Sequence, residues 1–190
     1  MKKFLLLGAI LFLFYLTILP KKDRRPGSQN PPSFTESISQ AATIGKPVRL
    51  IINRIGVNAK IEHVGLDRER NMDVPKSWDN AGWYSLGPKP GMPGNVVIDG
   101  HLDSPNGPAV FFRLSKLEKG DEIYIISEDG KEYIYTVNNM EKYEFDKFPL
   151  KKVFGETNSF NLNLITCVGV FDRIAKNYSH RIVVYSSLLQ

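Results

Sequence analysis

The chain lacks the residues that several common kinds of site require. It contains a single cysteine, Cys167, among 190 residues, so an internal disulfide cannot form and zinc sites built from several cysteines are excluded. The net charge is only +5, and no stripe of lysine and arginine alternates with aromatic residues. The sequence therefore does not indicate nucleic-acid binding.

Long stretches with a helical period are also missing after residue 46. Residues 48–52 instead alternate apolar and polar side chains, as in a strand with one buried face. Glu128-Asp129-Gly130 between two such runs predicts a hairpin turn. So many short strands with Gly- and Pro-rich turns predict a mostly β domain, either a closed barrel or a sandwich. Further strands are predicted at residues 59–64, 72–74, 95–99, 122–127, 131–137, 162–167 and 181–188, with short helices at 109–117 and 150–154.

One long apolar run is present, at the N-terminus. It occupies residues 4–19 without a charge and is closed by Pro20. As a helix it would be about 25 Å long, slightly less than the roughly 30 Å of a hydrocarbon core. Its last residues, Thr-Ile-Leu-Pro at 17–20, lack the small residues of a signal-peptide cleavage site. We therefore interpret residues 1–20 as an uncleaved signal-anchor.

The next segment, residues 21–45, is rich in Lys, Pro, Ser, Gln and Asn and has little apolar patterning. This composition predicts a flexible tether, with at most a short helix near residues 34–42. Four basic residues at 21–25 outnumber Lys2 and Lys3 on the other side of the apolar run. By the positive-inside rule, that balance favours a cytoplasmic location for the C-terminal part, and the sequence alone leaves the orientation open.

Three strand-like stretches end or begin in a residue with catalytic chemistry. The run at 95–99 is followed by Gly100 and His101, the run starting at 162 ends in Cys167, and Arg181 heads the last predicted strand. Reactive groups are commonly held where a rigid scaffold gives way to a loop.

Each of these residues has a simpler explanation when taken alone. A lone cysteine is most often a small buried hydrophobe, a lone histidine a structural residue and a lone arginine a surface charge. His63, His180 and Arg173 lie in weaker settings, namely a strand pattern, an exposed position and a polar loop. Trp78 fits packing better than base stacking.

Taken together, His101, Cys167 and Arg181 form a set that suits acyl transfer. An ordinary cysteine has a pKa near 8.5 and is only a few per cent thiolate at neutral pH, so it needs a base such as imidazole. The same imidazole can later protonate a departing amine. Attack on an amide carbonyl creates an oxyanion, for which a guanidinium is a permanently charged donor.

In this order and spacing the motifs resemble those of the sortases, which are cysteine transpeptidases of the Gram-positive cell surface. The motifs that carry this resemblance are Gly-His-Leu-Asp at 100–103, Leu-Ile-Thr-Cys at 164–167 and the arginine of the last strand. The resemblance covers residues 47–190 and implies a closed eight-stranded β-barrel with one or two short helices. Two longer strings, at 166–172 and 107–114, are most similar to class F, and class D is the less favoured assignment.

The resemblance also implies roles for individual residues. It maps the catalytic histidine onto His101, the nucleophile onto Cys167 and the arginine onto Arg181, with Arg173 as the rival for the last role. Asp103 is close enough in sequence to orient His101, although an Asx-type turn explains it better. No acidic cluster matches the calcium site of some class A members, so we expect neither a metal nor a cofactor.

The resemblance further implies an anchor at 1–20, a flexible extracellular linker at 21–45 and a catalytic barrel at 46–190, held on the cell membrane by a single pass. This orientation overrides the charge balance described above. The expected reaction cleaves the sorting signal of a secreted surface protein through a thioacyl-enzyme, and transfers it to an amine acceptor from the cell wall or another protein. Two alternatives stay open: a cysteine peptidase that only hydrolyses, and an inactive sortase-like surface binding module.

Overall fold

The computed structural model describes residues 44–189. The predicted signal-anchor at 1–20 and nearly all of the predicted linker, including its short helix at 34–42, lie outside the described residues. Within the described part, no helix combines the length and the apolar character needed to cross a membrane.

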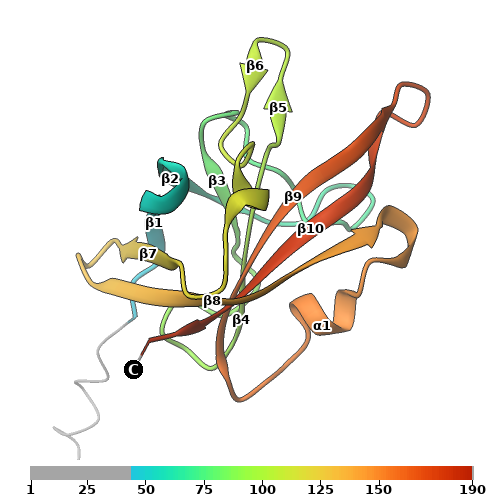
Figure 1. Ribbon diagram of the computed structural model, residues 1–190. Helices are drawn as coiled ribbons and strands as arrows, with labels where there is room; N and C mark the ends of the chain where they lie inside the picture. The colour runs from blue at the N-terminus through green and yellow to red at the C-terminus, as the bar shows by residue number, and fades with distance from the viewer. Residues whose placement is uncertain (1–43, 190) are drawn as a thin grey trace, which may run out of the picture. The chain divides into compact units, whose positions relative to one another are not determined.

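Eight strands close into a barrel, which confirms the expected fold class. Their order around the barrel is β1-β2-β3-β4-β9-β10-β8-β7, and pairing of β1 with β7 closes it. A separate hairpin, β5-β6, stands at the top of Figure 1. The strands are β1 (Pro47–Ile52), β2 (Val57–Val64), β3 (Ala81–Tyr84), β4 (Gly94–Gly100), β5 (Asp103–Ser104), β6 (Gly107–Pro108), β7 (Glu122–Ser127), β8 (Glu132–Glu144), β9 (Phe160–Asp172) and β10 (Asn177–Leu188). The helices are α1 (Leu150–Phe154) and the 3₁₀ turns η1 (Asn53–Ile55), η2 (Leu114–Lys116) and η3 (Phe145–Lys147).

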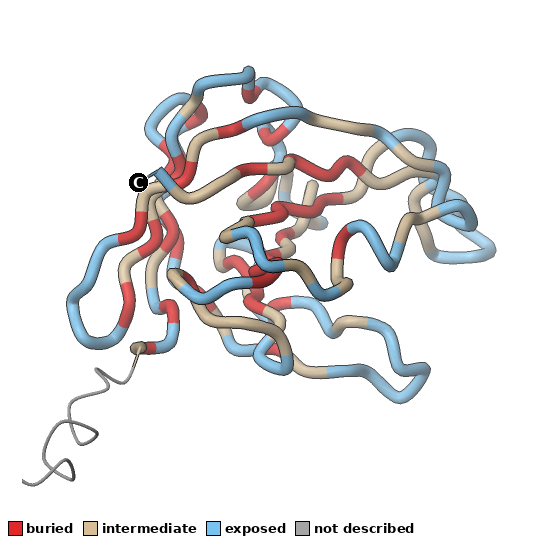
Figure 2. Tube along the Cα trace, turned by 90° about the horizontal axis from the view of Figure 1, so that it is seen from below, coloured by how far each residue is buried: buried red, intermediate tan, exposed pale blue. Residues whose placement is uncertain are grey.

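The barrel wall is apolar on both faces where α1 covers it. A large buried cluster fills the interior. A smaller cluster lies outside the wall and joins Val97, Ile165 and Val183 to Val153 of α1. Figure 2 shows that the buried stretches run through the strands, while most turns are exposed. Because strand side chains alternate between faces, the outer cluster marks which residues of β4, β9 and β10 point outward.

The strand predicted at residues 72–74 is wrong, since this segment contributes only an isolated bridge at Met72. The eighth strand is instead β3, which is parallel to β2 and antiparallel to β4. Pro75 has no amide hydrogen to donate to a ladder. Gly82 of β3 allows close packing, because a Cβ there would lie 2.6 Å from Oδ1 of Asp99.

The helix predicted at residues 109–117 is reduced to the turn η2. Phe111, Leu114 and Leu117 are all buried and recur every three residues. That spacing fits a 3₁₀ turn, in which side chains three apart are aligned. Two other local predictions are confirmed: α1 has the predicted bounds, and the turn at residues 128–130 joins β7 to β8.

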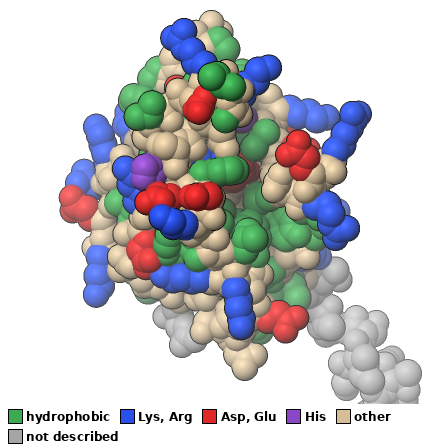
Figure 3. All heavy atoms as spheres, turned by 90° about the vertical axis from the view of Figure 1, so that its right-hand side faces the viewer, with side chains coloured by type: hydrophobic (Ala, Val, Ile, Leu, Met, Phe, Trp, Pro, Cys, Tyr) green, Lys and Arg blue, Asp and Glu red, His purple; other side chains and the backbone are tan. Residues whose placement is uncertain are grey.

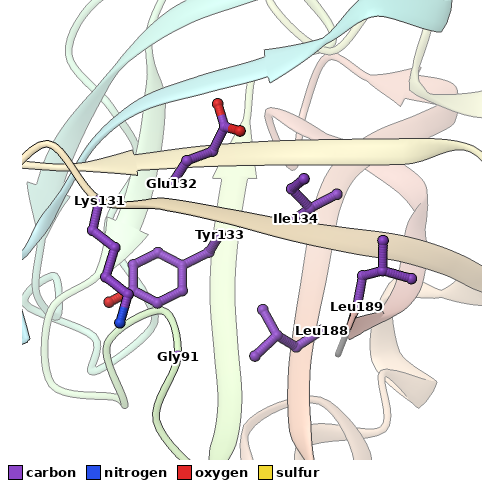
Figure 4. A pocket seen from close by; sticks show the side chains of 7 residues that line it. All are labelled: Gly91, Lys131, Glu132, Tyr133, Ile134, Leu188 and Leu189. Carbon is purple, nitrogen blue, oxygen red and sulfur yellow. The ribbon is translucent and has the colours of Figure 1, made fainter.

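The loop that contains Gly91 packs on two tyrosines of β8. The amide of Gly91 donates to the hydroxyl of Tyr135 at 3.2 Å. Figure 4 shows Gly91 beside the ring of Tyr133, at a surface hollow of about 370 Å³ that includes none of the three predicted catalytic residues. The φ angle of Gly91 is 80°, and a Cβ there would overlap the Tyr133 ring. Position 91 therefore requires glycine for two separate reasons.

We expect Gly91→Ala to lower the free energy of unfolding by about 2–5 kcal/mol, of which roughly 1–2 kcal/mol is backbone strain and about 1–3 kcal/mol is the overlap with Tyr133. Gly130→Ala is the matched control, because Gly130 has a φ of 78° but open space around its Cα. The free energy of unfolding of Gly130→Ala should fall only by the part that comes from backbone strain. Chemical denaturation of both variants measures the difference, and equal losses would contradict the packing role of Gly91.

Candidate active site

Cys167 lies within β9, which pairs with β10 on one side and with β4 on the other. Its Cα partner in β10 is Arg181, and Arg181 is in turn paired with Tyr143 of β8. Directly opposed residues of antiparallel strands project to the same face. Cys167, Arg181 and Tyr143 therefore form one row across three strands.

His101 extends this row on the far side of β9. β4 runs parallel to β9, and Oγ1 of Thr166 donates a hydrogen bond to the carbonyl of Gly100 at 2.8 Å. His101 follows Gly100 as Cys167 follows Thr166. Because neighbouring strands lie about 4.8 Å apart, this register brings His101 beside Cys167.

The row lies on the outer face of the barrel. Ile165 precedes Cys167 by two positions and Val183 follows Arg181 by two, and both belong to the outer cluster. Since side chains alternate along a strand, Cys167 and Arg181 share that face. Figure 3 shows the side of the molecule on which α1 and the β9–β10 hairpin lie, where apolar side chains gather between charged groups.

The ring of His101 is held from two directions. Its Nε2 lies 2.8 Å from the carbonyl oxygen of Pro75. The ring also packs on the indole of Trp78, with centroids 4.3 Å apart and planes tilted by 52°. The packing role expected for Trp78 is thus a contact with His101, a partner that the sequence did not indicate.

The thiol of Cys167 is partly buried. Burial raises its pKa, the guanidinium of Arg181 lowers it, and the negative charges of Asp103 and of Asp99, when the latter is ionised, raise it again, so the pKa lies above the ordinary value. At neutral pH the thiol rests protonated, and a base is needed to make it nucleophilic.

Asp99 precedes His101 by two positions in β4. Its Oδ1 is buried, and no described residue hydrogen-bonds to it. Burial raises the pKa of Asp99 well above its ordinary value, and the nearby charges of Asp73 and Glu62 add to the rise. This carboxyl therefore stays protonated at pH values where a free aspartate is charged.

The guanidinium of Arg181 is fixed on its own hairpin. Nη1 donates to the carbonyls of Tyr178 at 3.2 Å and His180 at 3.1 Å, and Nη2 donates to Oδ1 of Asn177 at 2.6 Å. Cζ lies 4.8 Å from the ring centroid of Phe145, a cation–π distance. A guanidinium has five N–H donors, so these contacts leave donors for a ligand.

Asp103 joins the β5–β6 hairpin to the β9–β10 hairpin. Its Oδ2 accepts a hydrogen bond from the hydroxyl of Tyr178 at 2.5 Å. This bond raises the pKa of Tyr178 to about 12. The carboxylate of Asp103 thus contacts a distant strand, where the sequence favoured an Asx-type turn.

Two of the predicted strand ends are wrong. β9 continues beyond Cys167 to Asp172, and β10 begins before Arg181, at Asn177. Of the three predicted catalytic residues, only His101 lies just past a strand end. Figure 1 shows the extra length as a two-stranded hairpin that extends beyond the barrel. Its strands pair with each other outside the core, so apolar alternation does not mark their ends.

Arg173, the rival for the catalytic arginine, lies in the exposed turn between β9 and β10. Arg181 is the arginine that is paired with Cys167 and lowers the pKa of its thiol. The geometry therefore favours Arg181 for a role beside the sulfur.

The other two histidines have contacts of their own. Nε2 of His63 lies 3.0 Å from the carbonyl of Pro47, and Nδ1 of His180 lies 2.7 Å from the hydroxyl of Ser179. Across residues 44–189, no group of three or more His, Cys, Asp or Glu side chains is arranged to hold a metal ion.

A protein-family model described as Sortase domain matches residues 50–189. The chain belongs to the sortase family. Known sortases are cysteine transpeptidases. No curated protein sequence matches the chain.

Solved sortase structures share this fold. Sortase C-1 from Actinomyces oris is 22% identical, with a TM-score of 0.60, and the match covers 86% of this chain and 83% of that chain. Sortase D5 from Clostridium perfringens is 22% identical, with a TM-score of 0.57 and coverage of 77% and 79%. Sortase A from Corynebacterium diphtheriae is 21% identical, with a TM-score of 0.59 and coverage of 87% and 73%. The match to sortase C1 of the group B Streptococcus pilus island 1 covers only 65% of that chain.

Replacing Arg181 should make the sortase thiol a weaker acid. Because the guanidinium lowers the pKa of Cys167, we expect Arg181→Gln to move the midpoint of the alkylation rate against pH to higher pH. Alkylation by iodoacetamide reports on this thiol alone, since the chain has one cysteine. Arg173→Gln is the control and should leave the midpoint in place. A shift in the Arg173 variant and none in the Arg181 variant would reverse the assignment.

Proposed function

We propose that this sortase is a cell-surface cysteine transpeptidase that cleaves the sorting signal of a secreted protein and transfers it to an amine. The supporting observation is the row that runs from His101 through Cys167 to Arg181 across β4, β9 and β10. Each residue in that row has the chemistry that one part of acyl transfer requires.

The first half of the reaction forms a thioacyl-enzyme. Sγ of Cys167 attacks the carbonyl carbon of a Thr–Gly-type peptide bond while its proton passes to the imidazole of His101. The C–N bond then breaks, and His101 gives that proton to the departing amine. The raised pKa of Cys167 makes the base necessary, because little thiolate exists beforehand.

The second half returns the free enzyme. An amine acceptor loses a proton to His101 as it attacks the thioester, and the S–C bond breaks. Cys167 leaves as a thiolate and recovers the proton from His101. In both halves an oxyanion forms on the carbonyl oxygen, and the free N–H donors of Arg181 bind either this oxygen or the substrate backbone.

The finer assignments are also part of the proposal. The motifs around Cys167 and after His101 support class F, with class D less favoured, whereas the similar solved structures reported above are from classes A, C and D. Residues 1–20 serve as the single-pass membrane anchor, 21–45 as the extracellular linker and 46–190 as the catalytic domain. The apolar run at 4–19 and the cell-surface location of sortases support this arrangement.

Mass analysis of the intact protein tests the proposed nucleophile. After incubation with a library of sorting-signal peptides, we expect the wild-type chain to gain the mass of an acyl fragment and Cys167→Ala to gain none. The library members that load the enzyme reveal the motif. Transfer at the wild-type rate by Cys167→Ala would end the proposal.

Product analysis separates the proposed reaction from its two alternatives. With oligoglycine or a diamine present, the acyl fragment should appear on the amine rather than on water. A product that stays purely hydrolytic would indicate a peptidase. A wild-type thiol that neither acylates nor reacts with iodoacetamide at neutral pH would favour the inactive binding module.

A further inference from the structure

His101 is contacted by the loop that leads into β3, the strand beside β4. We call residues 75–80, which precede β3, the Pro75 loop. The carbonyl of Pro75 contacts Nε2 of His101, and the indole of Trp78 packs on the ring. The amide of Val110 donates to the carbonyl of Trp78 at 3.0 Å. The amide of Phe111 donates to the backbone carbonyl of His101 at 2.9 Å. The loop is thus tied both to the imidazole and to the segment that follows it.

Glu62 of β2 holds the body of the Pro75 loop. Its Oε2 accepts from the amide of Lys76 at 2.8 Å, and its Oε1 accepts from the amide of Ser77 at 3.1 Å and the side chain of Asn80 at 2.8 Å. Burial raises the pKa of Glu62, but the hydrogen bonds from Asn80, Lys76 and Ser77 lower it more, so the net pKa is below the ordinary value. Bonds to a charged acceptor are roughly twice as strong as neutral ones, so this carboxylate is a firm support for the loop.

The contact with Pro75 also determines which ring nitrogen carries a hydrogen. A backbone carbonyl only accepts hydrogen bonds, so Nε2 of His101 must be the donor. In the neutral ring the lone pair then resides on Nδ1. Only Nδ1 is free to accept a proton.

We infer that Glu62 is a positioning residue for His101, which it orients through the Pro75 loop, and that Nδ1 of His101 moves the protons of the reaction. This inference rests on the proposed function. During acylation Nδ1 takes the proton of Sγ and passes it to the nitrogen of the leaving amine. During transfer Nδ1 takes a proton from the acceptor amine and returns it to the sulfur. Nε2 keeps its hydrogen on the Pro75 carbonyl throughout.

Asp67 offers a matched control for Glu62. Its Oδ1 accepts from the amides of Glu69 at 2.8 Å and Asn71 at 2.9 Å, and its Oδ2 accepts from the side chain of Asn71 at 3.4 Å. Both carboxylates therefore support a loop between β2 and β3 with three hydrogen bonds. In the described part of the chain, residues 67–71 make neither a hydrogen bond nor a ring contact with His101.

Acylation kinetics give the first test. We expect Glu62→Ala to lower kcat/KM by about 10²-fold, the loss that a displacement of about 1 Å produces at a catalytic group. Asp67→Ala should leave kcat/KM unchanged, although its melting temperature falls like that of Glu62→Ala. Glu62→Gln keeps one oxygen for Ser77 and Asn80, so its kcat/KM should lie between that of Glu62→Ala and that of the wild type. No loss in Glu62→Ala, or an equal loss in Asp67→Ala, would overturn the inference.

Nitrogen NMR of the imidazole rings gives a second test that needs no turnover. The chain has three histidines, and the spectrum of His101→Gln identifies which signals belong to His101. For the neutral ring of the wild type, we expect a protonated Nε2 and an unprotonated Nδ1. Glu62→Ala, or Glu62→Gln if the alanine variant does not fold, should show the two tautomers averaged. A hydrogen on Nδ1 in the neutral wild-type ring, or an unchanged spectrum in the Glu62 variants, would disprove the inference.

The two tests separate this inference from the proposed function. A wild-type protein with the expected tautomer that never forms an acyl-enzyme counts against the function alone. A wild-type protein that forms the acyl-enzyme, but whose Glu62 variants match it in rate and spectrum, counts against the inference alone.

Discussion

The site depends on β9, because this strand is hydrogen-bonded to β4 in parallel and to β10 in the antiparallel direction. A slip of one residue would turn every side chain of the strand to the opposite face. Two side chains support the observed register: Asn163 donates to the carbonyl of Val153 in α1, and Thr166 donates to that of Gly100, both at 2.8 Å. The position of Cys167 is therefore set by the ladder and by these contacts on both faces of the sheet.

Burial and charge act in opposite directions on the sulfur. Partial burial raises the pKa of Cys167, and the guanidinium of Arg181 offsets part of that rise. The thiol consequently needs a base, which is the role proposed for His101. The fold fixes the imidazole by a backbone carbonyl and an indole rather than by a carboxylate.

The mostly β class, α1 and the turn at residues 128–130 could be predicted from sequence because local apolar patterning and turn chemistry determine them, whereas the choice of a closed barrel over a sandwich came from the family resemblance. β3 could not, since this short strand depends on pairing with β2 and β4 on its two sides and on the small size of Gly82. The motifs located the histidine and the cysteine, but not what holds them. Pro75 contributes a backbone carbonyl, which leaves no side-chain signal, and Glu62 reads as an ordinary charged residue on a strand.

Cys167 and Arg181 face each other across a single ladder, whereas His101 belongs to the end of another strand. Any bending of the β9–β10 ribbon carries the sulfur and the guanidinium together and changes their separation from the imidazole. A compound wedged between β4 and this ribbon would thus part the imidazole from the sulfur while the guanidinium stays opposite the sulfur.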